Sequence, residues 1–346
     1  MRVAFVAFET SHRTGRQGSA RTEALARGLA ARGHDVTVFC SQWWYGADAG
    51  AVRVDDDVRY RRIDIAPTLT SSLLRLPGQL ARYQPDVVHA TPAPPAVLLA
   101  ARAGAALARA RLVCDWYGDE PVDGSRLAGP ATQVADAYLV PSEFVRSQFR
   151  ERGLTADRLT VLPEYIDLEY IRGIEPRSAG PDVVAGRHLD ADANLESLFL
   201  GLAEQRDREW TAAVVGDGPA RATFEQAAAD LRIDDRVRFV GDISRAERIA
   251  LYRGAHAFVH TARRESFAVE LLWALACGCV GIVEYQQASA AHELVERRDR
   301  GFRVTSSEAI ADALSEARAL PHLTVDDDLT PFDREQVLAE LVSVYR

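Results

Sequence analysis

Short apolar runs alternate with stretches of helical periodicity through both halves of this chain. In the first half, apolar runs at 3–8, 36–40, 87–90, 112–115 and 137–140 are separated by segments such as 22–32, and a polar, turn-rich stretch is expected at 45–57. Strand and helix repeated in this order require a parallel sheet with helices on both faces. The sequence therefore predicts the α/β class, with a doubly wound sheet.

The same alternation restarts near residue 183, after a stretch rich in glycine and proline at 167–181 that is typical of a linker. Strands are expected at 183–184, 212–215, 237–240, 257–260 and 280–284, and helices at 195–204, 220–231, 246–252 and through Trp273. Because a single core stops growing at roughly 250 to 300 residues, we predict two domains, 1–170 and 171–330, and a C-terminal helix at 331–346. Ligands bind beyond the carboxyl ends of such strands, so the two doubly wound domains are expected to face each other across a cleft.

Composition narrows the function classes. All 41 basic residues are arginine and the formal net charge is −9, which argues against general nucleic-acid binding. The longest apolar stretches are shorter than the roughly 18 residues that a membrane span requires, and no basic region followed by an apolar segment begins the chain. We therefore expect a cytoplasmic protein. The four cysteines are scattered without paired clusters, so buried thiols rather than a metal site are expected.

Two motifs in the second half carry chemical information. Gly216, Asp217, Gly218 and Pro219 follow the expected strand 212–215, where glycine allows close approach and proline suits a first helical turn. Glu265, Ser266 and Phe267 then lead into an apolar helix. In order and spacing, these motifs resemble the donor half of retaining family 4 glycosyltransferases, the glycosyl transferases group 1, which have the GT-B fold with two Rossmann-like domains.

The resemblance implies a hexosyltransferase. Residues 1–170 would form the acceptor domain and 171–330 the nucleotide-sugar donor domain, and the terminal helix would either cross back to the first domain or close the second. A hexose would pass from a nucleoside diphosphate sugar to a glycan or lipid-linked acceptor, with retention and without a cofactor or metal. Membrane-bound acceptors would suggest peripheral contact with the inner membrane face through Arg146, Arg150 and Arg152, which fit a solvated helix face equally well.

The resemblance also assigns the donor residues. Glu265 is the expected catalytic residue, because its family counterpart contacts the donor sugar at the end of a strand and a carboxylate there stabilises developing positive charge. The residues expected to bind the donor are Arg187, Gly216, Gly218, Arg263, Arg264, Ser266, Phe267 and Glu270. Arginine forks suit a diphosphate.

Two family positions differ in this chain. The lysine that usually follows the arginine is absent, and Trp273 stands where the family has a second glutamate, which accepts hydrogen bonds from the ribose. An indole cannot accept such bonds. Either Glu270, three residues earlier on the helix, substitutes for that acid, or Trp273 packs in a core and nucleotide binding is weakened or lost.

The first half offers acceptor residues by the same resemblance. Gly15 and Gly18 lie in a glycine-containing loop between strand and helix, and Tyr117 stands roughly where the family often has a histidine. Asp115 and Asp119 flank that tyrosine and would bind acceptor hydroxyls. These five residues are the predicted acceptor or interdomain set.

A second class of function stays open. Loss of the lysine and of the second acid favours a non-catalytic relative that acts as partner or scaffold of an active glycosyltransferase, whereas Arg187, Glu265 and the glycine turns favour an enzyme. A nucleotide-sugar epimerase and a nicotinamide dehydrogenase are weaker alternatives, since the acids and the full glycine fingerprint that they need are not evident.

Overall fold

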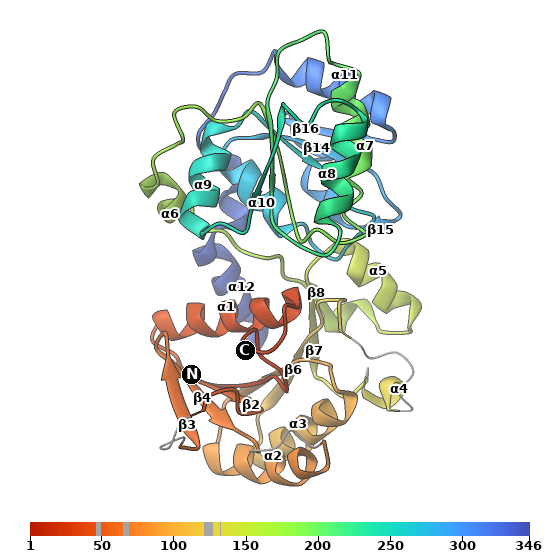
Figure 1. Ribbon diagram of the computed structural model, residues 1–346. Helices are drawn as coiled ribbons and strands as arrows, with labels where there is room; N and C mark the ends of the chain where they lie inside the picture. The colour runs from red at the N-terminus through yellow and green to blue at the C-terminus, as the bar shows by residue number, and fades with distance from the viewer. Residues whose placement is uncertain (46–49, 65–68, 121–126, 132) are drawn as a thin grey trace. The chain divides into compact units, whose positions relative to one another are not determined.

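A computed structural model describes residues 1–346 except 46–49, 65–68, 121–126 and 132 (Figure 1). The chain divides into two compact units. Unit 1 contains Met1–Pro163 and Val337–Arg346, and unit 2 contains Glu164–Gln336. Each unit is built on a parallel sheet that carries helices on both faces, so the predicted α/β class with two doubly wound, Rossmann-like domains is confirmed.

The sheet of unit 1 has the strand order β3-β4-β2-β1-β5-β6-β7-β8. Its strands are β1 (Arg2–Val6), β2 (Asp35–Cys40), β3 (Val52–Asp55), β4 (Val58–Arg62), β5 (Val87–Ala90), β6 (Arg111–Asp115), β7 (Ala137–Val140) and β8 (Leu159–Val161). Neighbouring strands are parallel except β3 and β4, which form an antiparallel hairpin at one edge. Strands β1, β2, β5, β6 and β7 agree with the apolar runs of the sequence, whereas β3, β4 and β8 were not predicted.

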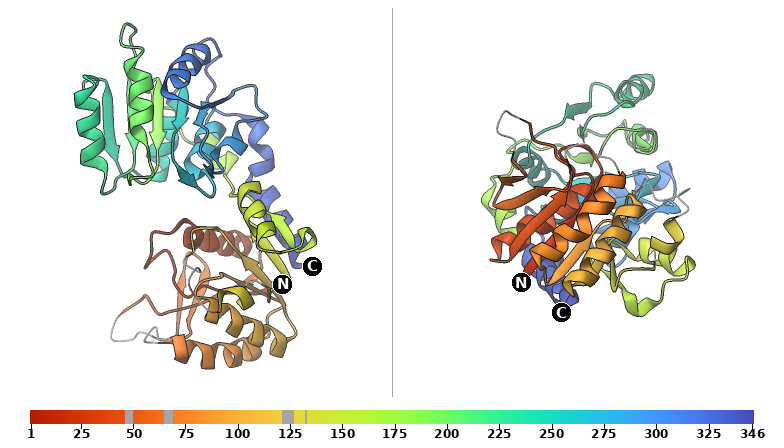
Figure 2. Two further views of the ribbon diagram at one scale, coloured as in Figure 1. Left: turned by 90° about the vertical axis from the view of Figure 1, so that its right-hand side faces the viewer. Right: turned by 90° about the horizontal axis from the view of Figure 1, so that it is seen from below.

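Helices cover both faces of this sheet. They are α1 (Gln17–Ala31), α2 (Leu69–Tyr83), α3 (Pro95–Ala108), α4 (Ala128–Ala131), α5 (Glu143–Glu151) and the 3-10 helix η1 (Ala156–Arg158). Apolar residues of α2, α3 and α5 share one core with one face of the strands. The terminal helix α12 (Arg334–Tyr345) packs against α1, where a Cβ on Gly28 would lie 2.7 Å from Leu338. Both chain ends therefore belong to unit 1 (Figure 2).

Unit 2 has the strand order β11-β10-β9-β12-β14-β16, all parallel. The strands are β9 (Val183–Gly186), β10 (Ala212–Val215), β11 (Val237–Gly241), β12 (Ala257–His260), β14 (Val280–Glu284) and β16 (Gly301–Val304). A separate two-stranded ladder pairs β13 (Arg264–Glu265) with β15 (Ala288–Ser289). Strand β13 of this ladder follows β12 in the chain and precedes α10.

The helices of unit 2 are α6 (Leu168–Gly173), α7 (Leu195–Ala203), α8 (Arg221–Asp230), α9 (Arg245–Gly254), α10 (Val269–Ala276) and α11 (Ser307–Ala317), with the 3-10 helices η2 (Ala291–Leu294) and η3 (Asp327–Phe332). Residues of α7, α8 and α11 share a core with one face of the sheet. On the other face, Tyr252 of α9 packs against Phe258 of β12, and Leu275 of α10 lies against Gly281 of β14. The buried strands explain why their sequences read as continuous apolar runs.

Three sequence expectations need correction. Strand β3 lies inside the stretch 45–57 that was expected to be turns, of which 46–49 lie outside the described residues; Val52 and Val54 are exposed on an edge strand, so no apolar run marks it. Helix α6 lies inside the expected linker 167–181, where the Asp167 carboxylate accepts a hydrogen bond from the backbone of Tyr170 at 2.8 Å. Helix α1 begins at Gln17, ahead of its expected start.

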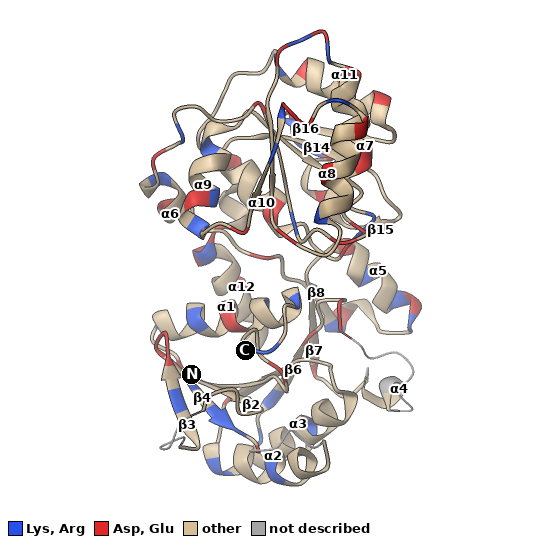
Figure 3. Cartoon of the chain, in the orientation of Figure 1, with Lys and Arg blue, Asp and Glu red and all other residues tan. Residues whose placement is uncertain are grey.

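The remaining global expectations concern charge, thiols and membranes. Cys40, Cys114, Cys277 and Cys279 are all free and buried, as expected. Basic and acidic residues are interspersed along the ribbon in both units (Figure 3). No helix within the described ranges combines the length and the apolar character needed to cross a membrane.

Candidate active site

The strand order of unit 2 creates a switch point between β9 and β12. From β9 the chain proceeds outward to β10 and β11, and it then returns to β12 on the other side of β9. In open α/β sheets, the carboxyl ends of the strands at such a point leave a crevice in which ligands bind. Arg187 directly follows β9, and the segment that ends in Glu265 directly follows β12. The fold therefore brings these two predicted site residues together.

Arg187 and Glu265 form a largely buried ion pair. Nη1 of Arg187 lies 3.7 Å from Oε2 of Glu265, and the side chains are 16% and 7% exposed. The guanidinium also contacts the Asp190 carboxylate at 3.3 Å and donates to the carbonyl oxygens of His188 at 3.1 Å and Arg264 at 3.5 Å. These contacts hold the guanidinium in one orientation, which is what preorganised electrostatic stabilisation requires.

The backbone of Glu265 is fixed by the small ladder. Glu265 pairs with Ser289 in the β13–β15 register, and its carbonyl oxygen accepts a hydrogen bond from the amide of Ala290 at 2.8 Å. A two-residue strand has little stability alone, so its pairing with β15 restrains the chain between β12 and α10. The carboxylate is thereby held at the carboxyl end of the sheet.

Two further arginines precede Glu265. The Arg263 guanidinium donates to the Asn194 side-chain oxygen at 2.8 Å, and its backbone amide donates to Asp192 at 2.9 Å. The Arg264 side chain is exposed, and it makes no hydrogen bond or ion pair with any residue that the structure describes. Arg264 thus presents a positive charge to solvent beside Glu265, which suits a phosphate-bearing ligand.

The predicted glycines bring two loops into contact. A Cβ on Gly216, where φ is +111°, would lie 2.0 Å from the carbonyl oxygen of Arg187. A Cβ on Gly218 would lie 2.4 Å from the carbonyl oxygen of Leu189. The close approach predicted at this turn is therefore an approach of the loop after β10 to the loop after β9. Gly216 thus packs against the backbone of Arg187, and Gly218 against that of Leu189.

The acid at the start of α10 is held by the neighbouring helix α9. Ser266 is half-buried, Phe267 is buried, and both precede the helix. One carboxylate oxygen of Glu270 accepts a hydrogen bond from the Tyr252 hydroxyl at 2.7 Å, and the other pairs with Arg248. Both partners lie on α9. The Glu270 carboxylate is therefore held by the neighbouring helix.

Trp273 is partly buried and contacts an arginine of α9. Its side chain is half-buried, and the guanidinium carbon of Arg245 lies 5.5 Å from the ring centroid. An arginine over an indole face is a cation–π contact. The indole is therefore partly buried beside α9, at the place of the missing acid.

In unit 1 the structure brings part of the acceptor set together. The amide of Gly18 donates to the Asp119 carboxylate at 3.2 Å, and a Cβ on Gly18 would meet the Cβ of Tyr117 at 3.0 Å. Gly15 is exposed, and a Cβ there would meet no described atom within 4 Å. Gly18, Tyr117 and Asp119 are thus neighbours, and Gly15 is separate from them.

Asp115 points into the interior of unit 1. Its carboxylate lies 2.9 Å from Nε of the fully buried Arg21 and 3.4 Å from Nε2 of His89, whose Nδ1 lies 2.7 Å from the Tyr345 hydroxyl. Loss of hydration on burial would raise the pKa of Asp115, but Arg21 and then His89 outweigh it, and the pKa is lowered. This buried series of polar contacts connects α1, β6 and β5 to the terminal helix α12. An acceptor hydroxyl would have to displace it to reach Asp115.

Sequence reasoning missed residues that organise the donor loops. Asn194 is buried with a φ of +53°, and its side-chain nitrogen donates to the Thr261 carbonyl at 3.1 Å and to the Glu284 carboxylate at 3.0 Å. His260, at the end of β12, has its pKa lowered to about 3 by loss of hydration and then by the charge of Arg187. An asparagine directly before an apolar helix was the available signal for Asn194.

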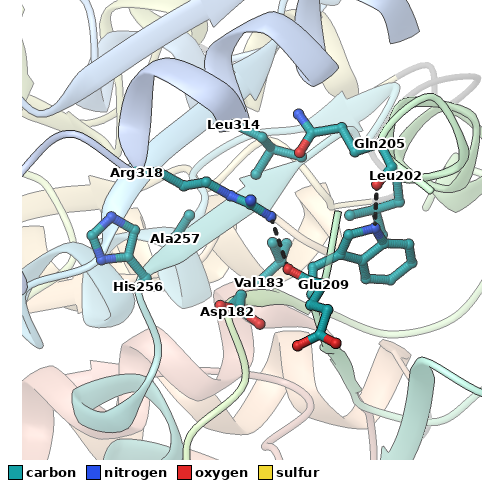
Figure 4. Close-up of a pocket in the computed structure, with 10 residues that line it drawn as sticks. Asp182, Val183, Leu202, Gln205, Glu209, His256, Ala257, Leu314 and Arg318 are labelled. Atoms are coloured by element: carbon teal, nitrogen blue, oxygen red, sulfur yellow. Dashed lines mark hydrogen bonds between the residues drawn. The ribbon is translucent and has the colours of Figure 1, made fainter. Parts of the chain in front are cut away.

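A separate cavity lies at the opposite end of the unit 2 sheet. It measures about 320 Å³ and is lined by residues at the amino ends of β9 and β12, among them Asp182 and His256 (Figure 4). Arg318 closes part of its wall by donating to the Glu209 carbonyl at 3.4 Å. Because it lies away from the carboxyl ends of the strands, it is not part of the candidate active site. In the described parts of both units, no three His, Cys, Asp or Glu side chains gather as metal ligands.

The sequence matches two family models. Residues 18–164 match the glycosyl transferase 4-like domain, and residues 187–324 match the glycosyl transferases group 1. The chain belongs to the group 1 glycosyltransferases. The second match begins at Arg187 and includes every predicted donor residue, and the first contains the neighbouring Gly18, Tyr117 and Asp119.

Known proteins similar to this glycosyltransferase include a GDP-mannose-dependent alpha-(1-6)-phosphatidylinositol monomannoside mannosyltransferase of Mycobacterium tuberculosis, which is 28% identical over 91% of this chain and 88% of the relative. A D-inositol 3-phosphate glycosyltransferase of Frankia alni is 31% identical over 46% of this chain and 45% of the relative.

Solved structures resemble the whole chain. A glycosyltransferase from Rickettsia africae has a TM-score of 0.79 at 15% identity, covering 99% of this chain and 97% of the other. Anabaena HepE in complex with UDP has a TM-score of 0.77 at 18% identity, covering 99% of each. These likenesses confirm the predicted GT-B fold.

Proposed function

We propose that this group 1 glycosyltransferase transfers a hexose from a nucleoside diphosphate sugar to a hydroxyl of a glycan or lipid-linked acceptor, with retention and without a metal or cofactor. The ion pair of Arg187 and Glu265 at the switch point of unit 2 is the observation that carries this proposal. The names of the relatives support a nucleotide-sugar donor, since one is GDP-mannose-dependent and the HepE structure contains UDP.

The chemistry follows from where the charges lie. In the reaction, the bond between the anomeric carbon and the diphosphate breaks, the acceptor oxygen forms the new glycosidic bond, and the hydroxyl proton leaves with the nucleoside diphosphate. Arg187 and Arg264 offset the negative charge that grows on the departing diphosphate, which is the work that a metal does in other sites. Glu265 holds the sugar hydroxyls and stabilises positive charge on the ring.

The acceptor is assigned to unit 1, at the neighbouring residues Gly18, Tyr117 and Asp119. A cytoplasmic location with peripheral contact at the inner membrane face completes the proposal. The helix that would make this contact is α5, where Arg150 is exposed and Arg146 pairs with Glu143 at 2.6 Å. Sedimentation with anionic lipid vesicles tests it; loss of binding in Arg150→Ala is expected.

Thermal unfolding with a panel of UDP, GDP and their sugar conjugates tests the donor site. A ligand that binds only the folded state raises the melting temperature, and a hundredfold excess over Kd stabilises by about 2.7 kcal/mol. One base should raise the melting temperature selectively, in EDTA as well as without it. The matching nucleotide sugar should then be consumed, and NMR of the product should show the retained anomeric configuration. A shift that requires a divalent cation would refute metal independence.

The second candidate is a non-catalytic partner of an active glycosyltransferase. Trp273 at the place of the second acid favours it, as does the Glu270 carboxylate held by Arg248 and Tyr252. The same panel separates the two functions, because a scaffold with an empty donor site would show no shift with any nucleotide. A shift without consumption of any nucleotide sugar would also favour the partner role.

A further inference from the structure

Unit 1 contains a cavity at its own switch point. The chain leaves β1 for β2 on one side of the sheet and later returns to β5 on the other side. A cavity of about 220 Å³ lies beyond the carboxyl ends of β1, β5 and β6, at the first turn of α1. The polar side chains that line it include Glu9, Arg16, Thr91, Asp119 and Glu120. Strand topology places the ligand of an open parallel sheet at this position.

Acidic residues outnumber basic ones among the described residues that line this cavity. In the part of the lining that the structure describes, the acids are Glu9, Asp119 and Glu120 and the single arginine is Arg16, whose Nη1 lies 3.5 Å from Oε2 of Glu9. Arg16 is therefore already paired with an acid of the same wall. An anionic ligand would meet a surplus of like charge, whereas a ligand rich in hydroxyls would find acceptors for its hydrogen bonds.

The amino end of α1 is already occupied by a carboxylate of the protein. The first amides of a helix are a ready site for a phosphate. Here the Gly18 amide donates to Oδ2 of Asp119 at 3.2 Å, and a Cβ on Gly18 would lie 2.9 Å from Oδ1 of the same carboxylate. Asp119 thus fills the place in which a phosphate would receive these hydrogen bonds.

The neighbouring Glu120 shows that the cavity resists further negative charge. Its oxygens accept hydrogen bonds from the amides of Tyr117 at 2.8 Å and Gly118 at 2.7 Å. Even so, loss of hydration and then the charge of Asp119 raise the pKa of Glu120 to about 8, and loss of hydration raises the pKa of Asp119. The negative charge of the cavity at neutral pH therefore comes chiefly from Glu9 and Asp119.

We propose that this cavity selects an uncharged, polyhydroxylated ring as the acceptor and rejects rings that carry a phosphate. The inference rests on the proposed glycosyl transfer, because only then is the ligand of unit 1 an acceptor. A preference for uncharged acceptors would distinguish this chain from the similar proteins whose names contain phosphatidylinositol and inositol 3-phosphate.

Matched acceptor pairs test the charge selection. Inositol is compared with inositol 3-phosphate, and methyl mannoside with its 6-phosphate, as substrates with the donor found in the nucleotide panel. The neutral member of each reactive pair should have a kcat/KM at least about tenfold higher, since like charges in a shared site are strongly disfavoured. Preference for the phosphorylated member, or no transfer to any neutral member by a protein that consumes the donor, would overturn the proposal.

Variants assign the selection to the cavity. Asp119→Asn and Glu9→Gln should each reduce the ratio between neutral and phosphorylated acceptors, chiefly by improving the phosphorylated one. Glu9→Gln leaves the contact between Gly18 and Asp119 in place, so it remains informative where Asp119→Asn unfolds the loop. Asp157→Asn, an exposed acid in the same unit, is the matched control and should leave the ratio unchanged. An unchanged ratio in both cavity variants would refute the role of these carboxylates.

Direct binding separates this inference from the proposed function. Calorimetry of the full chain with each acceptor pair needs no donor, so it tests the cavity even where no nucleotide binds to unit 2. If neutral rings bind but no nucleotide raises the melting temperature, the proposed transfer reaction is refuted and the proposed charge selection still holds. Tighter binding of the phosphorylated ring in the same experiment would remove the charge selection.

Discussion

Replacing Glu265 by alanine should slow glycosyl transfer far more than it destabilises the protein. At an effective dielectric constant of about 20, two charges 3.7 Å apart attract by about 4.5 kcal/mol, and the loss of hydration on burial offsets most of this energy. Arg187 keeps the Asp190 carboxylate at 3.3 Å after the change, so it is not left as an unpaired buried charge. We therefore expect a loss of about 1 to 2 kcal/mol in the free energy of unfolding, below the roughly 3 to 5 kcal/mol of an orphaned charge.

The effect on the reaction should be larger. Removing one preorganised group that stabilises transition-state charge lowers kcat by about 10² to 10³, which corresponds to about 2.7 to 4 kcal/mol. Steady-state transfer and urea unfolding on the same preparation measure both quantities. Glu316→Ala, an exposed glutamate of α11 in the same unit, is the matched control and should change neither. An unaltered kcat in Glu265→Ala would remove Glu265 from the mechanism, and a loss of stability as large as the loss in rate would make its role structural.

Three further predictions concern the loops, the nucleotide and the terminal helix. Gly216→Ala should lower the free energy of unfolding by about 2 to 4 kcal/mol, because the new Cβ would overlap a carbonyl oxygen at a residue with positive φ. Gly15→Ala should be nearly neutral, and equal urea midpoints for the two variants would contradict this prediction. Glu270→Ala should weaken nucleotide binding about tenfold in calorimetry, as expected for one lost hydrogen bond to a ribose, and unchanged affinity would leave the ribose without this partner. Tyr345→Phe should cost about 1 to 2 kcal/mol by leaving the buried Nδ1 of His89 without its hydroxyl partner, and a thermal unfolding curve identical to that of the wild type would show that this contact contributes nothing.

The sequence predicted the strands well because most of them are buried on both faces. A strand such as β10 at 212–215 reads as an uninterrupted apolar run bounded by a glycine turn, and the structure has it at the same residues. Strand β3 has the opposite character, since Val52 and Val54 are exposed at a sheet edge and the strand is interleaved with charged residues. Helix α6 is short and lies among glycines and prolines, so its periodicity could not be recognised. Burial on both faces of the sheet, rather than the β-propensity of single residues, decided which strands could be predicted from the sequence.

The candidate site was predictable only where local sequence determines position. Arg187 and Glu265 follow strands that the sequence located, so the rule for open sheets could place them at one edge. The partners of Glu270 could not be foreseen, because Tyr252 and Arg248 reach it from another helix. Asp115 shows the same limit: its position after a strand suggested a ligand contact, yet its partners Arg21 and His89 come from distant elements that enclose it. The neighbours of a side chain at the end of a strand depend on tertiary packing, because they come from other helices and strands.

The charges at the two switch points argue for a division of labour between the units. Beyond β9 and β12 of unit 2 lie Arg187, Arg263 and Arg264. The Arg264 side chain is exposed and makes no hydrogen bond or ion pair with the described residues, so a cation faces solvent there. Beyond β1 and β5 of unit 1, the described lining of the equivalent position holds the carboxylates of Glu9 and Asp119 beside one paired arginine. A diphosphate is stabilised by the first set and repelled by the second. Both positions are the ones at which open parallel sheets bind ligands, and their charges support our proposal of an anionic donor in unit 2 and an uncharged acceptor in unit 1.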